Sequence, residues 1–118
     1  MAFLLDQGQS IVDIHGETRT YIYGIVDEPI KTFRVLSDGT EEAGFYYCVK
    51  EYLNEAAKDA NAIPLTPTRE YYIYESDTND WNTYCSETAK KANGKSAWKL
   101  AYEHFLAQAE NSIYVGDE

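Results

Sequence analysis

The chain has 118 residues, 44% of them hydrophobic and 14% aromatic, and its 20 acidic and 10 basic residues give a net charge of −10. This length and apolar content suffice for one packed domain, residues 1–118, and argue against wholesale disorder. The acidic balance disfavours direct binding to nucleic acid or an anionic membrane. No stretch reaches the roughly 20 apolar residues of a membrane-spanning helix, and the first residues lack a secretory signal, so we expect a cytoplasmic protein.

The first third of the chain is rich in β-branched and aromatic residues, which predicts strands. A short apolar piece at residues 2–5 is expected at a sheet edge. Residues 11–15 and 18–26 predict a β-hairpin. Residues 27–29 (Asp-Glu-Pro) are expected to end its second strand, because proline cannot donate to a central ladder. A further strand is predicted at residues 31–36, with a turn after it.

Residues 40–61 predict an amphipathic helix, because apolar side chains recur there at three- and four-residue spacing. The apolar stripe consists of Phe45, Cys48, Val49, Tyr52, Leu53, Ala56, Ala57 and Ala60. Gly44 counts slightly against this helix, since glycine costs about 1 kcal/mol relative to alanine. Glu51, Glu55 and Asp59 would form a row of like charge along one side. We expect this central helix to lie across the sheet and to organise the fold.

The middle of the chain predicts a connector, a strand and a second helix. Residues 62–68 contain two of the three prolines and must be extended. A fourth strand is predicted at residues 69–75. A helix is then expected from Asp77 or Thr78 to about Ala92. The competing assignment is a hairpin that pairs residues 81–85 with the fourth strand.

A last helix is predicted from Ser96 to about Asn111, and residues 112–115 could add a terminal strand. Strands and helices therefore occur in blocks, which favours an α+β fold with an antiparallel sheet. We expect three N-terminal strands plus one or two later strands, packed by the central amphipathic helix and a C-terminal helical pair.

The sequence carries no signature of a catalytic site. G-x-S-x-G, Walker A, G-x-G-x-x-G and H-E-x-x-H motifs are all missing. His15 and His104 fall on separate elements, and Cys48 and Cys85 fall on predicted apolar helix faces. This placement favours buried free thiols over a catalytic Cys–His pair or a disulfide. We therefore expect a protein that is not an enzyme.

Residues 77–80 begin like a calcium-binding loop, but the glycine and the final glutamate of an EF-hand are missing in both registers. A looser site of Glu75, Asp77 and Asp80 is conceivable, and a solvated turn is favoured over it. We expect no metal and no cofactor.

Acids and aromatic residues concentrate in the second half of the chain. Between residues 70 and 87 there are five acids and no base, interleaved with tyrosine and tryptophan, the residues that serve as rigid anchors at interfaces. The competing interpretation is that the tyrosines pack in the core and the acids form a solvated surface. The predicted partner-binding residues are Glu51, Glu55, Asp59, Glu70, Tyr72, Tyr74, Glu75, Asp77 and Asp80.

We therefore expect a non-enzymatic binding protein that masks a basic surface of a nucleic-acid-handling protein. Carboxylates one helical turn apart have a spacing of about 5–6 Å, similar to that of phosphates on one strand. In size and charge alone, the chain resembles small acidic inhibitors such as phage anti-restriction and anti-CRISPR proteins, nuclease inhibitors and toxin-immunity proteins. The alternative is a structural or assembly protein whose tyrosine-rich strands associate with copies of itself or with a scaffold; a small enzyme or ligand-binding module is a third class. Four lysines between residues 90 and 99 form too small a patch to favour direct nucleic-acid binding.

Overall fold

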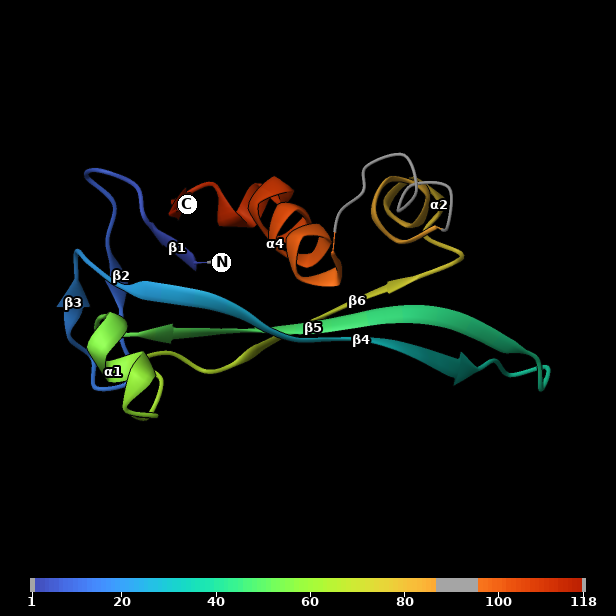
Figure 1. Cartoon of the computed structure of the whole chain (residues 1–118), viewed down its shortest axis with the longest axis horizontal. Helices are drawn as coiled ribbons and strands as arrows, with labels where there is room; N and C mark the ends of the chain where they lie inside the picture. Colours follow the sequence, from blue (N-terminus) through green and yellow to red (C-terminus); the bar gives the residue numbers. More distant parts are fainter. Residues whose placement is uncertain (1, 87–95, 118) are drawn as a thin grey trace.

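The computed structural model describes residues 2–86 and 96–117, and its main element is a five-stranded antiparallel sheet that curls into a half-barrel (Figure 1). The strands lie in the order β6-β5-β4-β1-β7. Their bounds are β1 (Ala2–Leu5), β4 (Tyr23–Val35), β5 (Glu41–Tyr52), β6 (Arg69–Tyr74) and β7 (Tyr114–Asp117). A separate small hairpin consists of β2 (Ile11–Val12) and β3 (Thr18–Arg19).

Helices lie on both sides of the sheet. They are α1 (Glu55–Asp59), α2 (Thr78–Asp80) with its continuation as a π-helical turn, η1 (Trp81–Cys85), and α4 (Ala97–Ala107) with a following 3₁₀ turn, η2 (Ala109–Asn111). We call the side that α4 and α2 cover the front face; α1 lies on the opposite side, the back face, at the end of β5 (Figure 1). The predicted α+β class and antiparallel sheet are confirmed.

The predicted central helix over residues 40–61 is wrong. Most of this segment is β5, which pairs with β4 along one edge and with β6 along the other. A central strand that is buried on both faces carries an almost continuous apolar run, and such a run also satisfies helical spacing. Only Glu55–Asp59 is helical, and the Asn54 side chain caps it by accepting a hydrogen bond from Ala57 N at 2.8 Å.

The two strands expected on either side of residues 27–29 are one strand, β4. The register against β5 shifts between Asp27 and Ile30, so the prolyl residue lies in a β-bulge and does not interrupt the strand. Glu28 has a positive φ of 53° at this bulge. The long β4–β5 hairpin that results projects beyond the rest of the sheet (Figure 1).

Other predicted elements are found with small changes. The hairpin expected at residues 11–15 and 18–26 is only the short pair of β2 and β3, because residues 23–26 belong to β4. The strand at residues 2–5 is not at an edge, since β4 and β7 flank it. The connector at residues 62–68, the strand β6 and the terminal strand β7 are confirmed.

The helix expected after Asp77 begins at Thr78, and the competing hairpin is wrong because Trp81–Cys85 is helical. Its predicted continuation to Ala92 lies outside the described residues. The last helix begins after Ser96, whose side chain accepts a hydrogen bond from Lys99 N at 3.3 Å, as predicted.

The core lies between the front face and α4. Phe105 of α4 contacts Phe3 of β1, with ring centroids 4.5 Å apart, and Tyr114 of β7 at 5.5 Å. Phe3 can lie flat on the sheet because its cross-strand neighbour is Gly24, where a Cβ atom would be only 2.2 Å from the Phe3 ring. Phe3 and Phe105 are both fully buried.

Phe105→Ala should therefore lower the free energy of unfolding by about 3–5 kcal/mol, because it removes a buried ring and leaves a cavity. Trp98→Ala is the matched control on the same helix; Trp98 is 47% exposed, and its loss should cost less than about 1 kcal/mol. Urea denaturation measures both. Equal costs would contradict the assignment of the core.

Candidate binding surface

The residues of the back face follow from the strand register. Tyr47 of β5 contacts His104 of α4, so the odd-numbered β5 side chains point to the front and the even-numbered ones to the back. Directly opposite residues share a face, and Tyr46 lies opposite Tyr72 in β6 and Ile30 in β4. We call the group of exposed and half-buried side chains on this side the tyrosine face; it consists of Arg34, Tyr46, Glu70, Tyr72 and Tyr74.

The three tyrosines of this face form a continuous aromatic strip. The ring centroids of Tyr46 and Tyr72 are 5.0 Å apart, and those of Tyr72 and Tyr74 are 6.0 Å apart with the rings nearly parallel, at 7°. Tyr72 is 49% exposed. Tyr46 donates a hydrogen bond to Glu70 Oε1 at 3.4 Å, and burial, together with the nearby Cys48 and Glu70, raises the pKa of Tyr46 to about 12. The hydroxyl of Tyr46 therefore remains a protonated donor at neutral pH.

Gly44 explains how Tyr74 lies flat against the sheet. Gly44 is directly opposite Tyr74 in the β5–β6 ladder, and a Cβ atom on it would be 2.8 Å from the Tyr74 ring. A glycine within a strand often marks such a close approach. The residue that weakened the predicted helix is thus the one that lets this tyrosine cover the strand.

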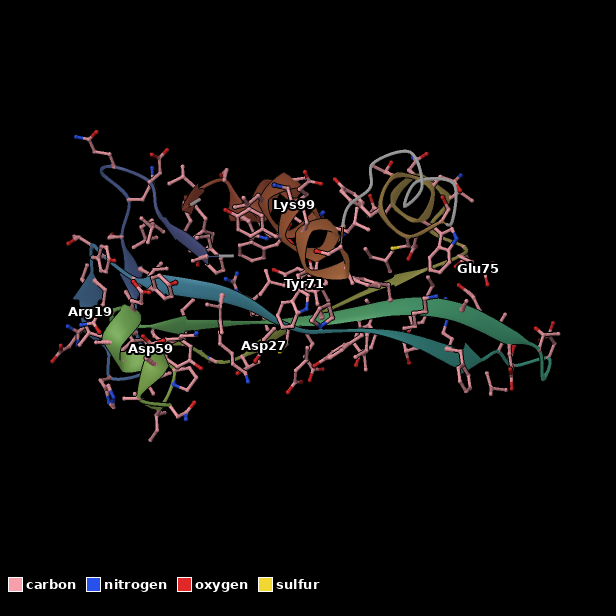
Figure 2. The ribbon with its side chains drawn as sticks, viewed as in Figure 1. Arg19, Asp27, Asp59, Tyr71, Glu75 and Lys99 are labelled. Carbon is pink, nitrogen blue, oxygen red and sulfur yellow. The ribbon has the colours of Figure 1, made fainter. Side chains whose placement is uncertain are left out.

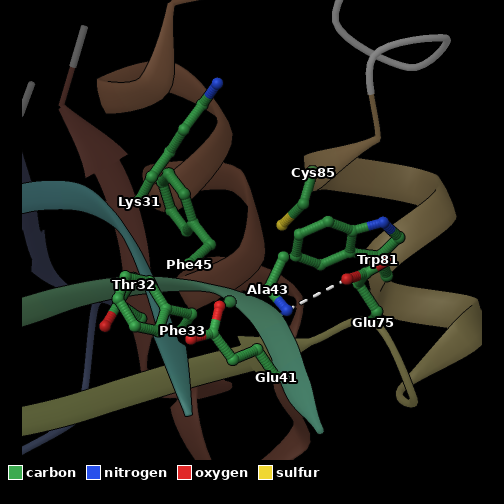
Figure 3. Close-up of a pocket in the computed structure, with 10 residues that line it drawn as sticks. Lys31, Thr32, Phe33, Glu41, Ala43, Phe45, Glu75, Trp81 and Cys85 are labelled. Carbon is green, nitrogen blue, oxygen red and sulfur yellow. Dashed lines mark hydrogen bonds between the residues drawn. The ribbon is translucent and has the colours of Figure 1, made fainter. Parts of the chain in front are cut away.

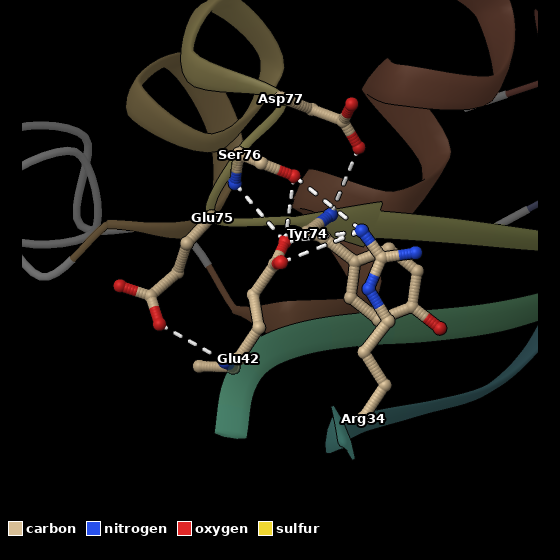
Figure 4. A network of polar contacts seen from close by, with 7 residues as sticks. Arg34, Glu42, Tyr74, Glu75, Ser76 and Asp77 are labelled. Atoms are coloured by element: carbon tan, nitrogen blue, oxygen red, sulfur yellow. Dashed lines mark hydrogen bonds and ion pairs between the residues drawn. The ribbon is translucent and has the colours of Figure 1, made fainter. Parts of the chain in front are cut away.

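Arg34 is held on the tyrosine face by an aromatic ring and a carboxylate (Figure 4). Its guanidinium carbon lies 3.8 Å from the centroid of Tyr74, and its Nη2 atom lies 3.3 Å from Glu42 Oε1. Ser76 donates two hydrogen bonds to the same carboxylate oxygen, from its hydroxyl at 2.7 Å and its backbone N at 3.1 Å. These bonds, with Arg34, hold the pKa of Glu42 below its ordinary value.

The predicted partner-binding residues separate into several groups. Glu70, Tyr72 and Tyr74 come together on the tyrosine face. Asp59 on α1 and Glu75 after β6 lie at opposite ends of the molecule (Figure 2). The remaining members are divided between these two ends and the core: Glu55 is exposed on α1, Asp77 and Asp80 lie at the start of α2, and Glu51 is buried.

The predicted row of Glu51, Glu55 and Asp59 does not form, because Glu51 belongs to β5 and the other two belong to α1. Glu51 is 2% exposed, and Arg69 Nη2 lies 2.6 Å from its Oε1 atom. Tyr114 donates a further hydrogen bond to the same oxygen at 2.9 Å. The position of Glu51 is that of a buried ion-pair partner, so a charge reversal there would disrupt the fold.

His104 takes part in an arrangement that resembles acid–base chemistry. Its Nδ1 atom shares a hydrogen bond with the Tyr47 hydroxyl, and its Nε2 atom lies 3.4 Å from Asp80 Oδ2. Tyr47 is fully buried and His104 is 4% exposed, and Tyr71 stacks on Tyr47 with centroids 5.0 Å apart. Burial lowers the pKa of His104, although Asp80 opposes the shift, and burial raises the pKa of Tyr47 well above its ordinary value. This geometry favours a packed structural group over a site that a substrate could enter.

A pocket of about 470 Å³ opens on the front face, between the β4–β5 hairpin and η1 (Figure 3). Its walls include Phe33, Phe45, Trp81 and Cys85. Glu75 also lines it, and the Glu75 carboxylate accepts a hydrogen bond from Ala43 N at 2.9 Å. The carboxylate of Glu75 therefore fastens β6 to β5 at the rim of the pocket.

Cys48 and Cys85 are buried free thiols, as predicted. Within residues 2–86 and 96–117, no three His, Cys, Asp or Glu side chains gather to hold a metal ion. In the same part of the chain, no helix is both long enough and apolar enough to cross a membrane. Comparison with models of known protein families, with curated proteins and with solved structures finds no match to this chain. The geometry of the tyrosine face is therefore the basis for the proposed function.

Gly44→Ala should lower the free energy of unfolding by about 1–3 kcal/mol, because the added methyl group overlaps the Tyr74 ring. In a Tyr74→Ala background the same change should cost clearly less, since the overlapping ring is gone. A double-mutant cycle measured in urea tests this coupling. Equal costs in both backgrounds would show that Tyr74 does not lie over Gly44.

Stability should also depend on the protonation of His104. Because its pKa in the folded state is lowered from 6.5, the unfolded chain binds more protons just below that pH. The free energy of unfolding should be fully retained above pH 6.5 and fall below it, by at most about 1.4 kcal/mol per pH unit.

Urea denaturation between pH 7.5 and about 5, above the carboxylate range, measures this dependence. His104→Gln should remove it, and His15→Gln, at an exposed position, should leave it unchanged. A slope that survives His104→Gln would assign the effect to another group.

Proposed function

We propose that the protein is a non-enzymatic binding protein whose tyrosine face occupies a basic surface of a nucleic-acid-handling partner protein. The observation that carries this proposal is the placement of Arg34, with its guanidinium 3.8 Å over the Tyr74 ring and beside the Glu42 carboxylate. The chain itself thus supplies an example of how an arginine side chain is held on this face. A partner's arginine would make contacts of the same two kinds, a cation–π contact and a charge-assisted hydrogen bond.

Tyr72 offers a second position of the same kind. Its ring is half-exposed and nearly parallel to that of Tyr74, and the exposed Glu70 lies two residues before it on the same face of β6. Tyrosine rings give a large contact area at a low cost in conformational entropy. Strand pairing already holds these rings in place, so little conformational entropy would be lost on binding.

The charge of the whole chain supports a basic partner. A net charge of −10 attracts a positively charged surface over a distance of about one Debye length, roughly 8 Å at physiological salt. Surfaces rich in arginine and lysine are typical of proteins that contact the phosphate backbone. Occupying such a surface would exclude the nucleic acid.

A regular row of carboxylates that mimics phosphates is not part of the proposed mechanism, because the three acids of the predicted row are divided between β5 and α1. Recognition instead depends on arginine side chains packing against tyrosine. An arginine-rich surface should therefore be preferred over a lysine-rich one, because the planar guanidinium stacks on aromatic rings better than an ammonium group does.

A labelled arginine-rich peptide provides a direct probe, with fluorescence anisotropy as the measurement. Glu70→Lys combined with Tyr72→Ala should weaken its binding at least about tenfold, which corresponds to about 1.4 kcal/mol. The matched control is Glu55→Lys with Leu53→Ala, which makes the same charge change beside another half-exposed apolar residue near α1. This control should weaken binding by less than about threefold.

The parent complex should also weaken as salt rises and should prefer the arginine peptide to a lysine peptide of equal length. An equal loss in the two double variants would mean that only net charge attracts the peptide. Binding that ignores salt and both double variants would reject the proposed function.

A further inference from the structure

The second edge of β4 is open along the projecting hairpin. β1 pairs with β4 only at Gly24 and Ile25, whereas β5 pairs with β4 as far as Val35. Within residues 2–86 and 96–117, no strand pairs with the other edge of β4 beyond the bulge. The projecting position of this hairpin is visible in Figure 1. An open edge of this kind is a template for pairing with another strand.

The register shows which backbone groups point to the open edge. Leu36 N donates to Thr40 O at 2.8 Å, so Leu36 and the even-numbered residues before it direct their backbone groups toward β5. Phe33 and Val35, which alternate with them, direct their N–H and C=O groups to the open edge. These groups can therefore form an antiparallel ladder with a further strand, in which Phe33 occupies a hydrogen-bonded position.

Apolar side chains accompany this edge on both faces. Ile30 is 54% exposed, Phe33 65%, Val35 66% and Leu36 36%. Soluble proteins usually protect an edge strand with charges, a bulge or a covering element, because exposed apolar edges associate. The bulge of β4 lies before Ile30 and leaves the apolar part of the strand open.

We propose that two copies of this chain pair through the open edges of β4, antiparallel and with Phe33 opposite Phe33 of the second copy. A twofold axis perpendicular to the sheet leaves the front faces of both copies on the same side. Directly opposite residues share a face, so the axis must pass between one residue and the same residue of the second copy. With Phe33 at the axis, Ile30 lies opposite Leu36, Lys31 opposite Val35 and Thr32 opposite Arg34. Each exposed apolar side chain then meets an apolar side chain or the aliphatic part of a longer one.

Neighbouring registers are worse for specific reasons. An axis at Lys31 or Arg34 would place like charges directly opposite each other. An axis at Thr32 would place Pro29, which has no N–H group and lies in the bulge, opposite Val35. Among the registers centred on residues 31 to 34, the one with Phe33 at the axis therefore avoids both conflicts.

Pairing at this edge would leave the tyrosine face open and would place two such faces on one continuous sheet. The two surfaces also respond to salt in opposite ways. Two copies that each carry a charge of −10 repel each other, so dimerisation should strengthen as salt screens the repulsion. Binding of an arginine peptide should weaken under the same conditions, so either proposal can fail without the other.

Sedimentation equilibrium of the full chain, from low to high micromolar concentration, tests the association. We expect a monomer–dimer equilibrium whose dissociation constant falls on adding salt. Phe33→Lys should raise that constant at least tenfold, because it places two ammonium groups opposite each other. Ile63→Lys, at a position 82% exposed in the connector, is the matched control and should leave it unchanged. A chain that stays monomeric throughout, or equal effects of both variants, would overturn the proposal.

Cross-linking tests the register even if the Phe33→Lys variant folds poorly. Residues at a hydrogen-bonded antiparallel position have Cα atoms about 5.5 Å apart, within the range that a disulfide spans. Phe33→Cys should therefore form a covalent dimer under mild oxidation, and Thr32→Cys, two residues out of register with its copy, should do so several times more slowly. The parent chain, whose two thiols are buried, should remain monomeric on a non-reducing gel. Faster cross-linking through Thr32→Cys than through Phe33→Cys would reject the proposed register.

Discussion

Strand β5 is buried on both faces and paired along both edges, and the positions of its neighbouring elements follow from this. On the front face, Tyr47 and Val49 are fully buried beneath α4 and its neighbours, and on the back face Cys48 is equally buried. Both edges of β5 are paired, so the strand fixes β4 and β6 relative to each other. Glu51 near its end is held by Arg69 of β6. The projecting hairpin joins β5 to β4, and the tyrosine face spans β5 and both of its neighbours, so both are consequences of this arrangement.

The burial of β5 on both faces also explains what could be predicted from the sequence. The strand predicted at residues 69–75 was found from its tyrosine-rich composition, and β6 (Arg69–Tyr74) confirms it. The β5 segment does not alternate in polarity, and its apolar residues fit a helical stripe as well as a strand. The run from Phe45 to Val49, rich in aromatic residues and ending in a β-branched one, favours a strand, whereas residues 55–59 (EAAKD) after Asn54 are all polar or small and rich in helix formers. Local composition was therefore more informative here than spacing.

The candidate site was predictable only in part, because it depends on strand pairing. Glu70, Tyr72 and Tyr74 alternate within one strand, so their common face follows from the sequence. Arg34 and Tyr46 join them only through the ladders of β4 with β5 and of β5 with β6, which place residues far apart in the chain side by side. The glycine under Tyr74 was the available signal, because glycine next to tyrosines in a strand indicates a ring lying across the backbone. Glu51 was assigned to the surface since its ion-pair partner, Arg69, lies in another element.

In the proposed function, the tyrosine face, and not the acidic surface in general, receives a basic partner. The most direct measurement is an NMR titration of the ¹⁵N-labelled protein with an arginine-rich peptide. We expect the largest changes in amide shifts at Tyr46, Tyr72 and Tyr74, with little change at Glu55 and Asp59 on α1. Changes centred on α1, or spread evenly over all exposed acids, would contradict the proposed function.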